Sequence, residues 1–289
     1  MTCLVGYTPD RSGSDALALA QMLTRGIDLD LAVCMVMPET WGYPSPANVD
    51  AEYKVFLDQH TRKSLDKARA ILGSASNARF ISATAKSAST GLARMAAEIS
   101  ADIIVLGSPR DGPARRCAFG SVASGLVSET NRPLALAPRG FARETASQVA
   151  RVTCAYVADS QGDRTLAAAA DLARRHKVPL RLVTFVVRDR QMYPSFVGYD
   201  AENAVANSWR QQAVEAQEAA IAKLPRDVTA STAVGDGRDW RRAIAAIDWR
   251  AGDVMVAGGH STGIWYGLVF GSVFNRLLRY ATVPIIAVP

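Results

Sequence analysis

The sequence predicts an α/β protein built from two tandem doubly wound domains, each a five-stranded parallel sheet. Two observations lead to this fold class. The two halves of the 289-residue chain repeat each other at a spacing of about 150 residues. In each half, β-branched and aliphatic runs alternate with longer segments whose apolar residues recur at helical spacing. That alternation is typical of parallel strands joined by crossover helices.

The repeat extends through the chain and defines its domains. Tyr7 and Leu17 recur as Tyr156 and Leu166, Tyr43-Pro44-Ser45 as Tyr193-Pro194-Ser195, Asp50-Ala51-Glu52 as Asp200-Ala201-Glu202, Phe119-Gly120-Ser121-Val122 as Phe270-Gly271-Ser272-Val273, and Pro133 as Pro284. A period this long exceeds the roughly 20 to 50 residues of solenoid repeats, so a whole domain was duplicated. Because residues 139–148 are polar and show neither period, we expect domains at 1–138 and 151–289, joined by a linker at 139–150.

Each element of the first half follows from its local pattern. Short aliphatic runs predict strands, and apolar residues at helical spacing predict helices. In chain order we expect strand 4–7, helix 15–25, strand 31–37, helix 51–72, strand 79–83, helix 90–99, strand 103–106, helix 121–130 and strand 134–137.

The second half shows the same alternation. In chain order we expect strand 152–157, helix 163–176, strand 180–187, helix 203–224, strand 228–232, helix 239–247, strand 254–257, helix 272–280 and strand 285–288. After the second strand of each half comes a Pro-containing stretch, 38–49 and 189–198, with several aromatic residues. These stretches are either surface loops or lids over a ligand.

Composition limits the classes of function. The chain is 49% hydrophobic and 21% charged, as expected for globular domains, with a net charge of +6 and a pI near 9.3. No apolar run reaches the ~18 residues that span a bilayer, and no basic stretch opens a secretory signal at the N-terminus. We therefore expect a cytoplasmic protein that does not contact membranes. Because no zinc-finger spacing, aromatic RNA-binding pattern or long basic tract accompanies the charge, nucleic acid is not an expected partner.

The cysteines and histidines give no sign of a disulfide or metal site. The four cysteines form no CxxC pair, and three of them lie in apolar strand-like runs, where a thiol behaves as a small buried hydrophobe. The three histidines are scattered along the chain. We expect no metal and no disulfide.

Two catalytic motifs are present only in outline. Residues 259–263 read G-x-S-x-G after a strand, but the hydrolase mechanism needs a histidine after Ser261, and His60, His176 and His260 all precede it. Each glycine loop also has the G-x4-G outline of a P-loop without its Lys-Ser/Thr. Asp102 and Asp253 recur before the fourth strand of each half, where we expect ordinary solvated aspartates. No catalytic residue is predicted.

A glycine loop follows the fourth strand of each half. Thirteen residues after the first glycine of each loop, Gly120-Ser121 and Gly271-Ser272 begin the next helix. Glycine permits close backbone approach, and the unpaired N–H groups at a helix N-terminus attract phosphate. The same residues also suit a plain turn and helix cap. The loops are thus either phosphate sites or structural turns.

Three features of the sequence are the spacing Gly-x2-Gly-x9-Gly-Ser/Thr, an acidic residue soon after the first strand, and a first strand like Leu4-Val5-Gly6-Tyr7. In these features the sequence resembles the universal stress protein family in its tandem two-domain form. The resemblance covers nearly the whole chain. It implies a sheet order of 3-2-1-4-5, similar to adenine nucleotide alpha hydrolases, domains that pair through their last strands, and ATP binding at the glycine loop.

Site residues follow from this resemblance position by position. The phosphate-binding residues would be Gly107, Gly120 and Ser121 in the first copy and Gly258, Gly271 and Ser272 in the second. The backbone that holds adenine would be at Val36 and Val186, and the aspartates nearest the adenosine-contacting position are Asp10 and Asp159.

Both copies depart from the family pattern. Arg110 and Ser261 replace the second glycine of the motif, and Thr8 and Val157 stand where the aspartate is expected, two residues before Asp10 and Asp159. A Cβ at the glycine position should weaken or reshape the site. Arg110, with Arg115 and Arg116, could pair with phosphate directly or belong to a solvated face.

The resemblance therefore predicts a stress-response protein that binds a small adenine nucleotide, ATP with or without Mg²⁺, and hydrolyses it slowly at most. The first copy, with the basic loop, is the better candidate. The alternative is an interaction module without nucleotide, in which the pairing of the domains is the function. We expect the two domains to pair as a pseudo-dimer within the chain, and edge strands make a homodimer plausible as well.

Overall fold

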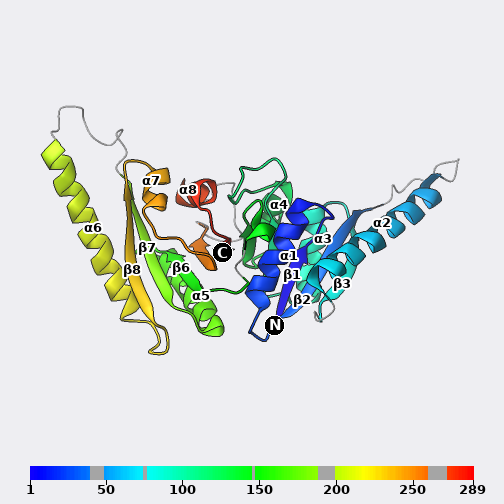
Figure 1. Ribbon diagram of the computed structural model, residues 1–289, viewed down its shortest axis with the longest axis horizontal. Coiled ribbons are helices and arrows are strands. Elements are labelled where there is room, and N and C mark those ends of the chain that lie inside the picture. The colour runs from blue at the N-terminus through cyan, green and yellow to red at the C-terminus, as the bar shows by residue number, and fades with distance from the viewer. Residues whose placement is uncertain (40–48, 74–76, 145–146, 188–198, 260–271) are drawn as a thin grey trace. The chain divides into compact units, whose positions relative to one another are not determined.

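The computed structural model describes residues 1–39, 49–73, 77–144, 147–187, 199–259 and 272–289, without the side chains of 49–52, 199–206 and 272. The described residues divide into two compact units, one of residues 1–147 with Pro289 and the other of residues 148–288. Each unit is an α/β domain (Figure 1).

The first unit contains five strands and four α-helices, which follow the chain from blue to green in Figure 1. They are β1 (Thr2–Gly6), α1 (Arg11–Thr24), β2 (Asp30–Pro38), α2 (Val49–Leu72), β3 (Arg79–Ala85), α3 (Ala88–Glu98), β4 (Ile103–Gly107), α4 (Ser121–Glu129) and β5 (Leu134–Ala137). A short 3₁₀ helix, η1 (Phe141–Arg143), follows β5.

The strands of the first unit are parallel and lie in the order β3-β2-β1-β4-β5. Val5 of the central strand lies between Val33 and Val105. Because crossovers are right-handed, the reversal of direction after β3 places α1 and α2 on one face and α3 and α4 on the other. The contacts agree, since α1 packs on α2 and α3 on α4. The expected fold class and sheet order are confirmed.

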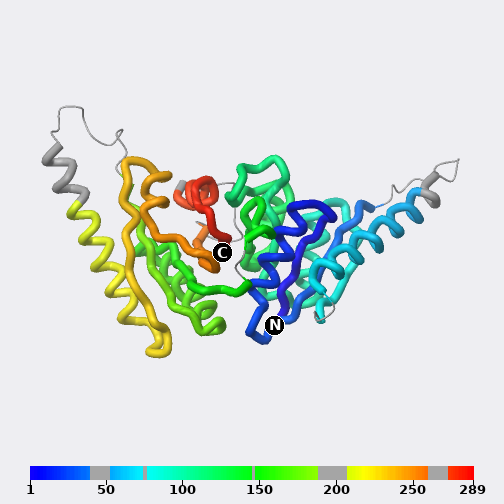
Figure 2. Tube along the Cα trace, viewed as in Figure 1, coloured from blue at the N-terminus to red at the C-terminus, as the bar shows by residue number. Residues whose placement is uncertain are grey.

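The second unit repeats this design (Figure 2, green to red). Its elements are β6 (Arg151–Ala155), α5 (Ser160–His176), β7 (Leu180–Val187), α6 (Tyr199–Ile221), β8 (Ala230–Gly237), α7 (Trp240–Ala245), β9 (Asp253–Gly258), α8 (Ser272–Tyr280) and β10 (Ile285–Val288). The parallel strands lie in the order β8-β7-β6-β9-β10. No helix among the described residues is both long and apolar enough to span a membrane.

The cores of both units consist of the strands and the inward faces of the helices. Cys3 on β1 and Cys154 on β6 are fully buried. Burial raises the pKa of the Cys3 thiol to about 12 and also raises that of Cys154. These thiols are therefore neutral at pH 7 and contribute as small apolar groups.

The first helix of each unit begins earlier than its apolar pattern predicts. Asp10 is the N-cap of α1, and its Oδ1 accepts a hydrogen bond from the Gly13 amide at 3.0 Å. Asp159 caps α5 in the same way, with the Gly162 amide at 2.7 Å. A Cβ at Gly13 would lie 1.8 Å from the Thr8 carbonyl oxygen, so glycine is required there. A repeated Asp-x2-Gly motif thus starts both helices.

β8 extends five residues beyond the predicted strand 228–232, to Gly237. The extension contains two glycines, which weaken a strand pattern in sequence. A Cβ at Gly235 would lie 2.6 Å from the Ala243 carbonyl oxygen, and one at Gly237 would lie 2.4 Å from the Ala243 amide nitrogen. The glycines therefore allow α7 to approach the strand closely.

Asp253 at the start of β9 is buried, with 1% of its surface exposed. The expectation of a solvated aspartate is therefore wrong at this position. The guanidinium of Arg151 donates to both carboxylate oxygens, at 3.0 and 2.6 Å, and Arg181 lies 3.6 Å away. Asp102, its counterpart in the first unit, is half-buried and accepts from the Thr2 amide at 2.7 Å.

Asp15 of α1 holds the segment that follows β5. This carboxylate is 2% exposed and accepts from the Gly140 amide at 2.7 Å and the Ala142 amide at 2.8 Å. The two bonds fix η1 against α1. Arg164 stands at the equivalent position of the second copy, so this carboxylate belongs to the first copy.

Replacing Asp15 with alanine should lower the free energy of unfolding by about 2 kcal/mol, because two charge-assisted hydrogen bonds to a buried carboxylate are lost. Urea denaturation followed by circular dichroism measures the change. The matched control is Asp28→Ala, since Asp28 is exposed. An equal loss in both variants would contradict this role.

Candidate functional site

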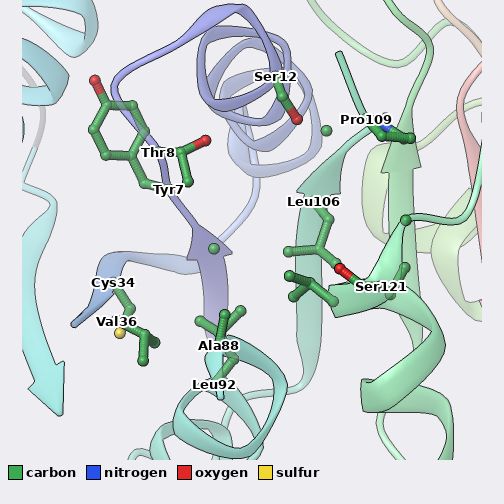
Figure 3. A pocket seen from close by; sticks show the side chains of 15 residues that line it. Tyr7, Thr8, Ser12, Cys34, Val36, Ala88, Leu92, Leu106, Pro109 and Ser121 are labelled. Carbon is green, nitrogen blue, oxygen red and sulfur yellow. The ribbon is translucent and has the colours of Figure 1, made fainter. Parts of the chain in front are cut away.

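A cavity of about 210 Å³ opens at the carboxyl ends of β1 and β4 in the first unit (Figure 3). Ligands in open parallel sheets bind at this edge, beside the point where the strand order reverses. The cavity is bounded by the start of α1, the start of α3 and the N-terminus of α4. Its lining residues are Gly6, Tyr7, Thr8, Ser12, Cys34, Val36, Ala88, Leu92, Leu106, Gly107, Pro109, Gly120, Ser121, Val122 and Ala123.

Four of the six residues predicted for the first site lie together around this cavity: Val36, Gly107, Gly120 and Ser121. The remaining two, Asp10 and Arg110, are not among the lining residues. Asp10 is exposed and caps α1, and its Oδ1 also accepts from the Thr8 hydroxyl at 2.8 Å. Arg110 is exposed on the loop that follows Pro109.

The N-terminus of α4 faces the cavity without a side-chain cap. Gly120 is the N-cap residue, and within the described part of the chain this cap has no side-chain hydrogen bond. The first N–H groups of a helix have no partner within the helix, and they carry the positive end of its dipole. This turn therefore offers hydrogen-bond donors and a partial positive charge to a ligand in the cavity.

Gly120 does not need to be glycine for the sake of the fold. Its φ of −92° and ψ of −180° are open to any residue. A Cβ at this position would have its nearest neighbour, Cβ of Pro109, at 3.5 Å, which is an ordinary contact. The missing side chain instead leaves space beside the first turn of α4.

Gly107, in contrast, is required by packing within the protein. A Cβ there would lie 2.0 Å from the Ser12 carbonyl oxygen and 2.7 Å from its Oγ. The end of β4 thus lies directly against the start of α1. Of the two glycines predicted to bind phosphate, Gly107 is required by packing, whereas no packing contact of the described residues requires glycine at Gly120.

The loop between β4 and α4 is fixed by hydrogen bonds to the end of β5. The buried Ser108 hydroxyl donates to the Ala137 carbonyl at 2.7 Å and accepts from the Ala118 amide at 3.1 Å. Arg139 donates to the Gly112 carbonyl at 2.6 Å. Gly259 replaces Ser108 in the second copy, so this hydroxyl anchor belongs to the first copy alone.

The chemistry of the cavity suits binding. The lining carries hydroxyl groups, those of Tyr7, Thr8, Ser12 and Ser121, which are labelled in Figure 3. Burial raises the pKa of the Cys34 thiol to about 12, which leaves it neutral and unreactive at pH 7. None of the described residues that line the cavity is acidic. The described residues also contain no group of three or more His, Cys, Asp or Glu side chains that could hold a metal.

The corresponding cavity of the second unit is smaller and differently lined. Its volume is about 170 Å³, and Asp159 and Gly258 are among its lining residues. Gln161 stands where the first copy has Ser12, and a Cβ at Gly258 would lie 2.8 Å from its Nε2. Phe274, which is 2% exposed, replaces Ala123 in the first turn of the helix. Larger side chains therefore occupy the space beside α8.

Some predicted residues of the second copy cannot be placed. Ser261 and Gly271 lie outside the described residues, as do most of the possible lids, residues 40–48 and 189–198, and the side chain of Ser272. Val186 is buried and lines a different cavity, which α6 covers.

Ser12, Gln161 and Phe274 were not predicted as site residues. The sequence could have indicated them, because the two copies differ at these positions. The repeat aligns Ser12 with Gln161 and Ala123 with Phe274, and the residues around them match. Similarity between the copies indicates the shared fold, and such a difference indicates where their cavities diverge.

Comparisons with known proteins agree with this architecture. The sequence model of the universal stress protein family matches residues 1–138 and 149–289. Universal stress proteins of Mycobacterium tuberculosis and Mycobacterium bovis are 33% identical to this chain over 294 residues, and the alignments cover 100% of each protein. A crystal structure of a universal stress protein from Archaeoglobus fulgidus matches 99% of this chain and 97% of its own, with a TM-score of 0.58 and 12% identity. A functionally unknown protein from Pseudomonas aeruginosa matches 99% of this chain and 92% of its own, with a TM-score of 0.59 and 13% identity.

Proposed function

This chain belongs to the universal stress protein family, and we propose that its first unit binds an adenine nucleotide, ATP foremost, with the phosphate chain at the N-terminus of α4. The protein acts by binding and serves the stress response through the nucleotide-bound state. The expected pairing of the two copies, and of two chains, stays a prediction.

One observation supports this proposal above the others. Gly120 leaves the first turn of α4 without a side-chain cap and leaves room beside it, although no contact with the described residues requires glycine there. A phosphate oxygen fits this arrangement, because it needs amide donors and close backbone approach. A cavity of about 210 Å³ is below the roughly 300–1,000 Å³ of small-molecule sites. It therefore holds the phosphates beside α4, while the base lies at the edge of the cavity that Val36 lines and extends beyond it.

The proposal assigns separate roles to the polar groups. The amides of α4 and the Ser121 hydroxyl bind the inner phosphates, and the hydroxyls of Thr8 and Ser12 face the ribose. Exposed Arg110 supplies a positive charge to the outer phosphates. Because the described lining contains no carboxylate, any Mg²⁺ arrives on the phosphate chain.

In the second unit the geometry argues against a phosphate chain. Gln161 lies over Gly258, and buried Phe274 takes the place of Ala123. This observation favours the alternative for the second copy alone, namely a unit that has kept the fold and lost the phosphate site.

The first experiment introduces the glutamine of the second copy at the equivalent position of the first unit. We expect calorimetric titration of the unmodified chain with ATP-Mg²⁺ to give a Kd in the micromolar range, and Ser12→Gln to weaken it at least tenfold, or about 1.4 kcal/mol. The glutamine should extend over Gly107 as Gln161 extends over Gly258.

The matched control is Ser14→Gln, the same substitution two residues further along α1, outside the cavity lining. It should leave the affinity unchanged. Titration without heat at millimolar nucleotide, or equal losses in both variants, would refute a site at the N-terminus of α4.

A further inference from the structure

A second cavity in the second unit, about 570 Å³ in volume, lies at the carboxyl ends of β6 and β7. Its size falls within the roughly 300–1,000 Å³ typical of small-molecule sites. It is separate from the 170 Å³ cavity beside α8 and shares only Val157 with it. Its lining residues are Tyr156, Val157, Ala158, Thr184, Phe185, Val186, Val187, Trp209, Gln212, Ala213, Ala216 and Trp240.

Four aromatic side chains from four elements or their ends meet around this cavity. The rings of Phe185 and Trp240 are 6.0 Å apart between centroids and tilted by 47°. Phe185, Trp209 and Trp240 are half-buried, so part of each ring remains open. Tyr156, 6% exposed, closes the end of β6. Such rings offer flat apolar surfaces that favour stacking with another ring.

The floor of the cavity is fixed and neutral. The Thr184 hydroxyl donates to the Tyr156 carbonyl at 3.0 Å and accepts from Nε2 of Gln217 at 2.9 Å. Gln217 is fully buried and also donates to the Ala233 carbonyl at 2.9 Å. These bonds hold β6, β7, β8 and α6 in one arrangement, so the cavity is formed before a ligand arrives.

The described lining of this cavity is uncharged, which does not favour a phosphorylated ligand. No described residue that lines this cavity is Lys, Arg, Asp or Glu. Arg276 approaches one of the lining rings, with its guanidinium carbon 5.8 Å from the ring centre of Trp240, and is engaged with that ring. Gln161 and Phe274 line the neighbouring cavity of about 170 Å³, where the first copy has the smaller Ser12 and Ala123.

We propose that the second unit binds an uncharged planar aromatic heterocycle, of purine to flavin size and without a phosphate chain, against Trp209 and Trp240. The inference does not require nucleotide binding by the first unit, because the two cavities lie in different units and share no residue.

Riboflavin is a suitable probe, because it is neutral and tricyclic and its fluorescence is quenched when it stacks on tryptophan. We expect saturable quenching by the full chain, and FMN should bind no more tightly than riboflavin. Trp209→Ala and Trp240→Ala should each weaken riboflavin binding about tenfold, in line with the effect of removing one stacking ring. Ser12→Gln should leave riboflavin binding unchanged.

A variant that fills the cavity with a larger side chain distinguishes loss of the site from loss of the fold. Ala216→Phe places a ring in the cavity and should abolish binding, while Ala219→Phe, at an exposed site on the same helix, should not. Thermal unfolding confirms that each variant is folded. No quenching at millimolar riboflavin, tighter binding of FMN, or quenching that survives both Trp240→Ala and Ala216→Phe would overturn the proposal.

Discussion

Replacing Asp253 with alanine is expected to lower the free energy of unfolding of the second unit by about 3–5 kcal/mol, the cost of removing one partner from a buried ion pair. Arg151 and Arg181 would remain at the base of β6 and β7, with 17% and 6% of their side chains exposed. Neither would have a counter-ion at Asp253, and they would repel each other. The Arg250 amide, which donates to Asp253 at 2.9 Å, would also lose its acceptor.

The environment of Arg181 makes this loss difficult to relieve. Its guanidinium donates to the Asp248 carbonyl and the Thr153 hydroxyl and lies 5.0 Å from the ring centre of Trp249. Burial, followed by the neighbouring Arg151, lowers the pKa of Arg181, which agrees with a cation held in a poorly solvated site. The group is fixed on several sides and cannot turn to water.

The measurement is urea denaturation combined with amide hydrogen exchange, which assigns the loss to the second unit. Asp248→Ala is the control, because the Asp248 carboxylate is 63% exposed and pairs with an exposed arginine. That variant should lose less than about 1 kcal/mol. Similar losses in both variants would mean that Asp253 contributes no more than a surface charge.

The strands and helices were predictable because their signals are local. β5, β7, α8 and β10 have the predicted bounds, since each is a continuous apolar or periodic segment with a clear end. Asp253 was misread because its partners are distant in sequence. Only the strand register brings it beside Arg151, and Thr153 beside Arg181.

The candidate site was predictable in part, for the same reason. The repeat identified Gly107, Gly120 and Ser121, which line one cavity. The repeat could not show whether Asp10 contacts a ligand or caps a helix, because either role calls for an acidic residue after the first strand. Nor could it show that Gln161 lies over Gly258, because that contact depends on how α5 packs on β9.

Alanine substitution of the two glycines in the first cavity should separate structure from binding. Gly107→Ala is expected to lower the free energy of unfolding by about 3 kcal/mol or more, because its Cβ would lie 2.0 Å from the Ser12 backbone oxygen and α1 would have to move. Gly120→Ala should change stability by less than about 1 kcal/mol, because its backbone conformation suits alanine and the remaining cost is that alanine is a poorer N-cap than glycine.

The effects on ATP should be the reverse. In Gly120→Ala the new methyl group enters the space beside the first turn of α4, and we expect the affinity for ATP-Mg²⁺ to fall at least tenfold in a protein of full stability. Calorimetric titration and urea denaturation of both variants give the two quantities independently. If Gly120→Ala bound ATP as tightly as the unmodified chain, the amides of α4 would not be the phosphate site. If it unfolded as readily as Gly107→Ala, Gly120 would be a structural turn, and its absent side chain would give no reason to place a ligand there.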